Sequence, residues 1–598
     1  MATKSGDTKI LFGDPRQPKA LPLTAPKARY TAEFGRKTEV LPKGWTKRRG
    51  CLPLPCDIQW DRDVPIKLGE GVTIYIDIYR PTKAGLKRPA VVAWSPYGKQ
   101  GGAGNSDLAE YPFRMGISQK KLSELQKFEG PDPAYWCNHG YAIVNPDPRG
   151  VSKSEGNIYQ WGPQESRDGA EVIDWIGEQV WCNGKVATTG NSYLAISSWE
   201  GFPDMLGDCT MIGGIASQPA MNFQLEVVST GFGENSWENP VATIQENPNN
   251  QAYYDEKRAQ NIQVPAYVVA SWTNPVHAYG TFSAYSRLQT DKWIRIHDGW
   301  EWTDYYEDEP VEDLRRFFDY YLKGIKNDWP STPRLRAKIL DTANPSPKTG
   351  TDFTTTTYPP PEAKPLTLYL DSKTKAFTTS PPEKPSQVEL KAATDDVLFN
   401  HTFSKDTILC GLPTISLDVS LASSTDADIY VNFEKILADG SVGTQLVVPF
   451  EKSYQSWLIR AAHRLGLINE THAIMHQGPR GQIRVSRRLD NSNQSYLAGG
   501  QTWRPDTYRP VAEGEVVCLE PRMTPIGMRF KAGEKLSVRI GGVDRTVYPH
   551  VSMSTLAVQE APYMTKAVNE KVNFTIHCGR GGQGDEISRV VLPVIQGA

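Results

Sequence analysis

The pattern of apolar and polar positions changes twice along the 598-residue chain. In residues 51–330, apolar runs that end in turn residues alternate with segments of helical period. Examples of these runs are "AVVAWSPYG" (90–98) and "VPAYVVASW" (264–272). Continuous apolar runs are typical of parallel strands that are buried on both faces. This zone therefore predicts an α/β fold on a parallel sheet, with functional residues in the loops at the carboxyl ends of the strands.

Two helices are predicted inside the same zone. The segment "SRDGAEVIDWIGEQVW" (166–181) places Val, Ile and Trp at helical spacing beside acidic residues. The segment "VEDLRRFFDYYLKG" (311–324) is an amphipathic helix that ends at Gly324, because glycine is the favoured residue just past a helix C-terminus.

The flanking zones have other patterns. Residues 1–50 are rich in Pro, Lys, Arg and Thr with little periodicity, which predicts an extended arm. Residues 331–365 contain a Pro/Thr-rich linker. From 366 to 598, short runs of alternating character such as "TISLDVSLAS" (414–423) are separated by Gly, Pro, Asp and Asn, as in an antiparallel β-sandwich.

Composition narrows the function classes. The chain has 68 acidic and 66 basic residues and no basic stripe, which argues against nucleic-acid binding. Its eight cysteines are sparse and lack C-x-x-C metal spacing, so we expect reduced, mostly buried thiols and no metal. No apolar leader and no long apolar run occurs, so we expect a cytoplasmic protein without a membrane anchor.

The segment "KVATTGNSYLAISSW" (185–199) is a candidate nucleophile turn. A β-branched run meets Gly190, turns through Ser192 and continues with helix-forming residues. A sharp strand–turn–helix of this kind displays a catalytic serine in α/β-hydrolases. Leu194 stands where those enzymes often have a second glycine, and a turn serine is more often structural, so the pattern alone leaves both interpretations open.

Four stretches, taken in order, resemble one enzyme family. They are "WSPYG" (94–98), "HGYAIVNPDPRGVSKSEG" (139–156), "DWIGEQVWCNGKVATTGNSYLA" (174–195) and "YYLKG" (320–324). Together they resemble the cocaine-esterase and X-prolyl dipeptidyl peptidase family (CocE/NonD) of α/β-hydrolases. The likeness runs over residues 58–595 and includes "GQIRVSRR" and "VVLPVI", which look like that family's C-terminal jelly roll.

The resemblance implies roles for several residues. Ser192 takes the position of the nucleophile, and the Tyr97 hydroxyl and the backbone N–H of Tyr193 take those of the oxyanion donors. Of nine histidines, only His277 and His297 follow strands of the α/β zone. The family's histidine follows its last catalytic strand, which favours His297 as the base and leaves His277 as the alternative.

The acid position departs from the family. Where the family has aspartate in "GW.D", this chain has "SWTN", with Asn274 at the carboxylate's position. Asparagine can orient an imidazole but cannot balance the charge of an imidazolium. The triad is then weakened, or another carboxylate replaces the aspartate, with Asp298 and Glu301 nearest in sequence, or the fold has been recruited for other chemistry.

We therefore expect an α/β-hydrolase domain (51–330) with a helical cap at about 200–262, followed by a C-terminal all-β jelly roll. The expected activity is cleavage of a small-molecule ester or amide through a Ser192 acyl-enzyme, without a cofactor. A cyclase, isomerase or acyltransferase of secondary metabolism on the same fold is the alternative that Asn274 motivates. A non-catalytic binding protein is a third hypothesis, and self-association into a homo-oligomer is left open.

Overall fold

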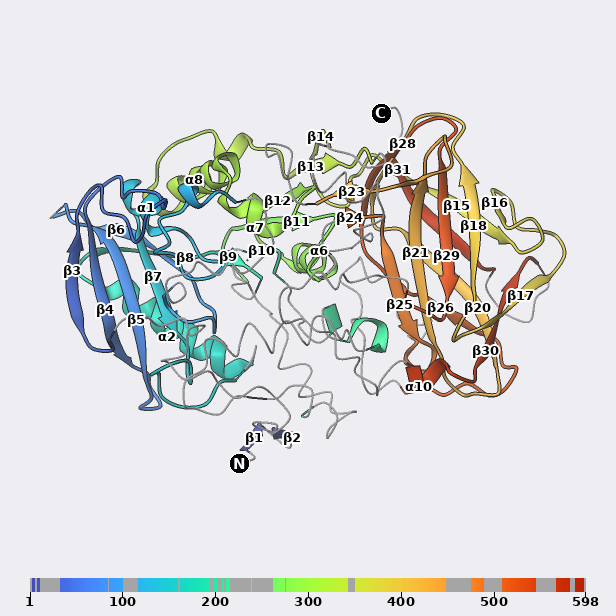
Figure 1. The fold of residues 1–598 in the computed structure, drawn as a ribbon, viewed down its shortest axis with the longest axis horizontal. Helices are drawn as coiled ribbons and strands as arrows, with labels where there is room; N and C mark the ends of the chain where they lie inside the picture. Colours follow the sequence, from blue (N-terminus) through green and yellow to red (C-terminus); the bar gives the residue numbers. More distant parts are fainter. Residues whose placement is uncertain are drawn as a thin grey trace.

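The computed structural model extends along one axis in three parts: β3–β8, β9–β14 and a β-rich part (Figure 1). The residues it describes are 3–5, 8–10, 33–83, 85–100, 117–159, 162–192, 198–201, 207–208, 211–215, 238, 243, 262–274, 276–342, 350–447, 475–488, 508–544, 566–580 and 587–595. A small hairpin, β1 (Thr3–Ser5) with β2 (Thr8–Ile10), precedes the three parts.

The first sheet has the strand order β3-β4-β5-β7-β6-β8. Its strands are β3 (Lys37–Leu41), β4 (Ile58–Lys67), β5 (Thr73–Pro81), β6 (Arg88–Val92), β7 (Ala142–Asp147) and β8 (Cys182–Thr188). The β6 strand pairs in parallel with β7 and β8, whereas β3, β4 and β5 join antiparallel. All five residues of β6 are buried, and the last three belong to the predicted apolar run.

The second sheet continues from the first at Thr189. Its order is β14-β13-β12-β11-β10-β9, with β9 (Gly190–Asn191), β10 (Ser198–Trp199), β11 (Ala266–Ser271), β12 (Lys292–His297), β13 (Leu335–Ile339) and β14 (Thr351–Thr355). The strands from β9 to β13 pair in parallel and β14 is antiparallel. The Thr189 N–H donates to the carbonyl of Val92 (3.1 Å), which ties the two sheets together. The carboxyl ends of β6, β8, β11 and β12 therefore face the same edge.

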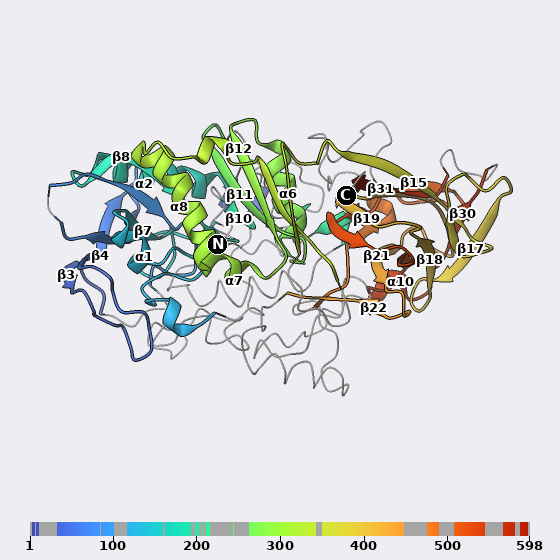
Figure 2. The ribbon, with the colours of Figure 1, turned by 90° about the horizontal axis from the view of Figure 1, so that it is seen from above.

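Helices connect these strands: α1 (Pro133–Asn138), α2 (Pro163–Glu178), α6 (Ala278–Arg287), α7 (Glu301–Tyr306) and α8 (Asp308–Lys323). The two predicted helices are confirmed as α2 and α8, and Gly324 adopts a left-handed φ of 69° at the end of α8. In Figure 2, α6 lies beside β11 and β12, and α8 runs toward the first sheet, where it contacts β6 and β8.

The C-terminal part consists almost entirely of strands. They are β15 (Ala363–Asp371), β16 (Ala376–Thr378), β17 (Ser386–Lys391), β18 (Asp396–Thr402), β19 (Thr407–Gly411), β20 (Thr414–Ala422), β21 (Asp428–Ile436), β22 (Val442–Gly443), β25 (Arg480–Arg484), β26 (Val517–Leu519), β27 (Arg522–Met523), β28 (Ile526–Phe530), β29 (Lys535–Gly541), β30 (Asn573–Cys578) and β31 (Arg589–Ile595). The short strands β23 (Gln445–Leu446) and β24 (Met475–His476) pair with each other, and α10 (Lys566–Asn569) is a one-turn helix. Four 3-10 helices are also described: η3 (Gln119–Lys121), η5 (Ile212–Gly214), η6 (Trp329–Ser331) and η8 (Val485–Arg487). Neighbouring long strands such as β21 and β29 pair antiparallel, as the alternating sequence predicts.

One hydrophobic core joins the second sheet to the C-terminal strands. Trp272, which follows β11, stacks on Phe282 of α6 with ring centroids 5.2 Å apart. A Cβ atom on Gly527 of β28 would lie within 2.6 Å of three indole atoms of Trp272, so only glycine allows this approach. The β-rich part thus packs closely against the loop that follows β11 and restricts its position.

The structure differs from the predicted boundaries at two places. Residues 37–41, within the predicted arm, form β3 because they pair along the free edge of β4. The predicted linker 331–365 contains β13 and β14, which extend the second sheet, since backbone pairing there outweighs the local Pro and Thr content. The predicted cap, about 200–262, falls mostly outside the described residues.

Two expectations from composition can be compared with the described residues. The seven cysteines among them form no disulfide, and five of the seven are buried. No helix in the described ranges has the length and apolar character needed to cross a membrane.

Candidate active site

Ser192 lies in a strained turn directly after β9. Its φ is 57°, in the left-handed region that residues other than glycine rarely adopt. The Ser192 N–H donates to the Trp199 carbonyl (3.0 Å), and the Asn191 N–H donates to the Glu129 carbonyl (3.1 Å), so both sides of the turn are held. The side chain is buried. This is the backbone geometry expected at a nucleophile turn.

The histidine beside Ser192 is His277. Its Nε2 lies 2.9 Å from Ser192 Oγ, and the residue immediately precedes α6. The expectation that His297 would occupy this position is corrected here. His297 is the last residue of β12 and pairs with Ser271 of β11, so it is still inside the sheet, where its Nε2 lies 2.7 Å from Glu200 Oε1. His277 comes six residues after Ser271, which gives its loop the length to reach Ser192.

A carboxylate lies on the far side of His277. Glu301 Oε2, from the first residue of α7, is 3.3 Å from His277 Nδ1. Of the two acids considered from sequence, Asp298 points elsewhere, because its Oδ2 accepts the Gly350 N–H (2.9 Å). Ser192, His277 and Glu301 therefore lie in a row, with the hydroxyl on one side of the imidazole and the carboxyl group on the other.

Asn274 supports this arrangement without lying behind the imidazole. Its Nδ2 donates to Glu301 Oε2. Its Oδ1 accepts the backbone N–H groups of Val276 (2.9 Å) and His277 (3.2 Å), which fixes the loop before α6. Asn274 thus orients both His277 and Glu301, whereas the sequence suggested that it replaces the acid itself.

The histidine and the acid have exchanged loops relative to the pattern that the sequence resembles. That pattern places the acid after β11 and the histidine after β12, but here His277 follows β11 and Glu301 follows β12. The two strands are parallel neighbours, so their following loops meet at one edge and either loop can carry either residue. Glu301 belongs to "DGWEW" (298–302), which follows the strand after which the family carries its histidine.

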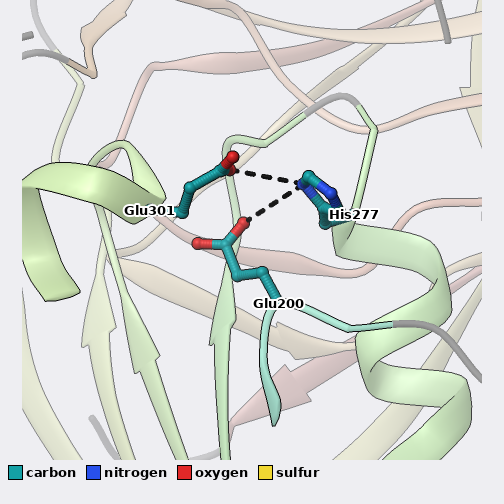
Figure 3. Close-up of side chains that lie close together, drawn as sticks. All are labelled: Glu200, His277 and Glu301. Carbon is teal, nitrogen blue, oxygen red and sulfur yellow. Dashed lines mark ion pairs between the residues drawn. The ribbon is translucent and has the colours of Figure 1, made fainter. Parts of the chain in front are cut away.

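Glu200 is a fourth member of the cluster that sequence reasoning missed. It follows β10 directly, its side chain is fully buried, and its Oε2 lies 4.0 Å from His277 Nδ1. In Figure 3 the carboxyl groups of Glu200 and Glu301 both point at the same edge of the His277 ring. A glutamate between Trp199 and Gly201 has no distinguishing sequence signal, because the preceding strand has only two residues.

Burial and the neighbouring acids set the protonation of this cluster. Burial lowers the pKa of His277, and the charges of Glu200 and Glu129 oppose this only in part. Burial and the charge of Glu200 raise the pKa of Glu301 well above its ordinary range. At neutral pH the imidazole of His277 is therefore neutral, and Glu301 holds its proton to a higher pH than an exposed glutamate does.

His297 belongs to a separate pairing behind the cluster. Burial opposes its charged form, but the negative charges of Asp304 and Glu200 outweigh burial and raise the pKa of His297. Asp304 in turn pairs with Arg295 and accepts the indole N–H of Trp199 (2.9 Å). His297 therefore contacts Oε1 of Glu200, whereas His277 faces Oε2 of the same carboxyl group.

Tyr97 lies in the loop after β6, next to the strand that leads to Ser192. Val92 and Thr188 are register partners in β6 and β8, so Tyr97 and Ser192 follow the carboxyl ends of adjacent parallel strands. The Tyr97 ring is buried against Phe128, with centroids 5.2 Å apart. Tyr193, the other predicted oxyanion residue, lies outside the described residues. The oxyanion roles of both residues stay predictions.

Two buried lysines anchor the Tyr97 loop. Lys127 Nζ donates to the carbonyls of Ala93 (3.2 Å) and Ser95 (3.1 Å), just before Tyr97. Lys99, two residues after Tyr97, lies 2.6 Å from Asp63 Oδ1 and 3.3 Å from Asp147 Oδ2. Since both ammonium groups are withdrawn from water and hold fixed partners, the loop has one well-defined path.

Two family models match the chain. Residues 70–205 match the X-Pro dipeptidyl-peptidase (S15 family), and residues 327–579 match the X-Pro dipeptidyl-peptidase C-terminal non-catalytic domain. A putative serine esterase of Mycobacterium bovis is 37% identical over 138 residues, which are 22% of this chain and 20% of that protein. The cocaine esterase of Rhodococcus sp. is 29% identical over 138 residues, 23% of this chain and 20% of that enzyme. The aligned part thus spans about a fifth of each esterase.

A solved structure covers far more of the chain. The CocE/NonD family hydrolase from Staphylococcus aureus superposes with a TM-score of 0.77 at 26% identity, over 90% of this chain and 94% of that one. The strand-rich C-terminal part is included in the match of the second family model. By its two domain matches and this full-length likeness, the chain belongs to the CocE/NonD and X-Pro dipeptidyl-peptidase family.

Proposed function

We propose that the chain is a serine hydrolase that cleaves an ester or amide bond of a small molecule through a Ser192 acyl-enzyme. The observation that carries this proposal is the contact of 2.9 Å between Ser192 Oγ and His277 Nε2, with Glu301 3.3 Å behind the imidazole. Relatives named as esterases and peptidases support the reaction class. The topology of the two sheets supports an α/β-hydrolase core, and the C-terminal strands support a jelly roll.

In the forward reaction, neutral His277 takes the proton of Ser192 as the serine oxygen attacks the substrate carbonyl. The resulting imidazolium is balanced by negative charge from the carboxyl groups of Glu301 and Glu200, which lie 3.3 and 4.0 Å from its Nδ1. The Tyr97 hydroxyl and the Tyr193 N–H stabilise the oxyanion. His277 then gives its proton to the leaving group, and water releases the acyl group by the same steps in reverse. The chain needs no cofactor for these steps.

The alternative of a cyclase, isomerase or acyltransferase rested on Asn274. Because Asn274 instead donates to Glu301, its presence no longer argues against a working triad. An acyltransferase would use the same triad, so it is the relatives named as esterases and peptidases that favour hydrolysis.

The test compares two histidine variants by labelling with a fluorophosphonate and measuring intact mass. We expect an adduct on Ser192 in the wild type and in His297→Ala, but not in His277→Ala, because only His277 activates the serine. Turnover of an activated ester should fall in parallel. Labelling that survives His277→Ala and disappears in His297→Ala would make His297 the base and overturn this assignment.

A Glu301→Gln variant tests the acid. It keeps the shape of the side chain but can never carry negative charge beside the imidazolium. Replacing the buried triad aspartate by its amide lowers kcat by about 10⁴ in a well-studied serine protease. We expect a fall of at least about 100-fold here, because Glu200 retains part of the charge. The matched control is Asp298→Asn, whose carboxylate faces Gly350 instead of His277.

A further inference from the structure

We propose that Glu200, His277 and Glu301 form a binding site for a divalent transition-metal cation such as Zn²⁺, and that occupation of this site switches off Ser192. The three side chains are buried, and one ligand atom from each lies within 4.8 Å of the others. The binding half of the proposal stands on this geometry alone. The inhibitory half also rests on the proposed function.

The distances match the coordination sphere of zinc. Zinc bonds to imidazole nitrogen and carboxylate oxygen are about 2.0–2.2 Å long, so two ligands of a tetrahedral site lie about 3.3–3.6 Å apart. His277 Nδ1 is 3.3 Å from Glu301 Oε2 and 4.0 Å from Glu200 Oε2. The Glu200 carboxylate would have to move toward His277 by a few tenths of an ångström. Figure 3 shows both carboxyl groups converging on the nitrogen.

The buried carboxylate of Glu200 has acceptor capacity that well-formed hydrogen bonds do not use. Within the described residues, neither of its carboxylate oxygens receives a hydrogen bond of good geometry, although His297 Nε2 lies 2.7 Å from Oε1. A buried carboxylate normally has its acceptor positions filled. A cation between Glu200, His277 and Glu301 would use Oε2 and balance two carboxylates in a site withdrawn from water.

The surroundings would hold these ligands in place. His297 contacts the other oxygen of Glu200, and Asn274 donates to Glu301, in the manner of the outer partners that orient metal ligands. One nitrogen and two carboxylate ligands suit Zn²⁺ or a similar transition-metal ion. Mg²⁺ and Ca²⁺ prefer an all-oxygen set with more ligands.

Occupation would block the proposed reaction by fixing the tautomer of His277. A metal ion on Nδ1 uses the lone pair of that nitrogen, so the ring proton resides on Nε2. Nε2 then donates to Ser192 Oγ and can no longer accept the serine proton. The ring also cannot become an imidazolium while the metal is bound.

The test begins with metal-free full-length protein prepared with a chelator and titrated with Zn²⁺ in a calorimeter. We expect one Zn²⁺ per chain with a Kd on the order of 10 µM or tighter and a rise in Tm, whereas Mg²⁺ should give neither. Glu200→Gln should weaken Zn²⁺ binding by about 10-fold or more. Asp298→Asn, which removes a nearby carboxylate outside the cluster, should bind as the wild type does.

A second measurement separates binding from inhibition. Fluorophosphonate labelling of Ser192 should disappear when Zn²⁺ is added and return when EDTA removes it. Absence of stoichiometric binding, or binding that Glu200→Gln leaves unchanged, would overturn the site. If Glu200→Gln does not fold, Glu301→Gln takes its place in the titration.

Full labelling of the zinc-bound protein would overturn the inhibitory step and leave the proposed hydrolase intact. A metal-free wild type that is never labelled would refute the proposed function. The calorimetric titration would then still decide the metal site by itself.

Discussion

Replacing Asn274 by aspartate tests the role that the structure gives to this side chain. If the site were a degraded triad, Asn274→Asp would restore the missing acid and raise ester turnover. In the structure, Asn274 Nδ2 donates to Glu301, so the same change removes a donor and brings a third carboxyl group against the Glu200–Glu301 pair. We therefore expect the variant to be slower and less stable.

The magnitude follows from two losses. A hydrogen bond to a charged group contributes about 1.5–3 kcal/mol. Two like charges about 3 Å apart repel by about 5 kcal/mol at an effective dielectric constant of about 20. Rearrangement of the side chains and uptake of a proton relieve part of this repulsion, so we expect a loss of about 3 kcal/mol of unfolding free energy. A displacement of Glu301 by about 1 Å would lower kcat by about 100-fold.

The assay is steady-state turnover of an activated ester by wild type, Asn274→Asp and Asn274→Ala, with folding followed by thermal and denaturant unfolding. Asn274→Ala removes the donor without adding charge, so its turnover and its stability should lie between those of the wild type and Asn274→Asp. A well-folded Asn274→Asp protein with turnover equal to or above the wild type would refute the assignment of Glu301 as the acid.

Three further changes probe the surroundings of the site. Tyr97→Phe should lower kcat by about 100-fold with unchanged unfolding, because it removes one proposed oxyanion donor; unchanged turnover would exclude that role. Gly527→Ala should lower the unfolding free energy by about 1–3 kcal/mol and slow turnover, because its Cβ would displace Trp272 and the loop that carries Asn274; wild-type stability would contradict this packing. Burial raises the pKa of Asp77 to about 6, and the charge of Lys99 opposes this shift only in part. The contribution of Asp77 to the unfolding free energy is therefore greatest below its pKa in the unfolded chain, and it is lost as the pH rises through 6. The unfolding free energy of Asp77→Asn, measured with denaturant, should therefore gain up to about 3 kcal/mol relative to the wild type between pH 4 and 7. A difference between the two proteins that does not change with pH would argue against this protonation of Asp77.

Local patterns in the sequence were enough to predict most of the framework. The apolar run at 90–98 overlaps the end of β6, and the run at 264–272 contains β11. The helical periods at 166–181 and 311–324 correspond to α2 and α8. Ser192 could be placed at a strand end because a β-branched run, a glycine and a serine are adjacent in the chain. These features depend on neighbours within a few residues, which is the range over which periodicity and turn preferences act.

The partners of Ser192 were decided by tertiary structure. Sequence order favoured His297 and marked Asn274 as a defect, yet His277 meets Ser192 across 85 positions and Glu301 meets Asn274 across 27. Loops that follow neighbouring parallel strands converge at one edge of the sheet, so several histidines and acids are candidates for one place. Loop length, the register that keeps His297 inside β12, and the burial of Glu200 select among them. None of these is a property of a short segment, because each depends on which strands lie side by side.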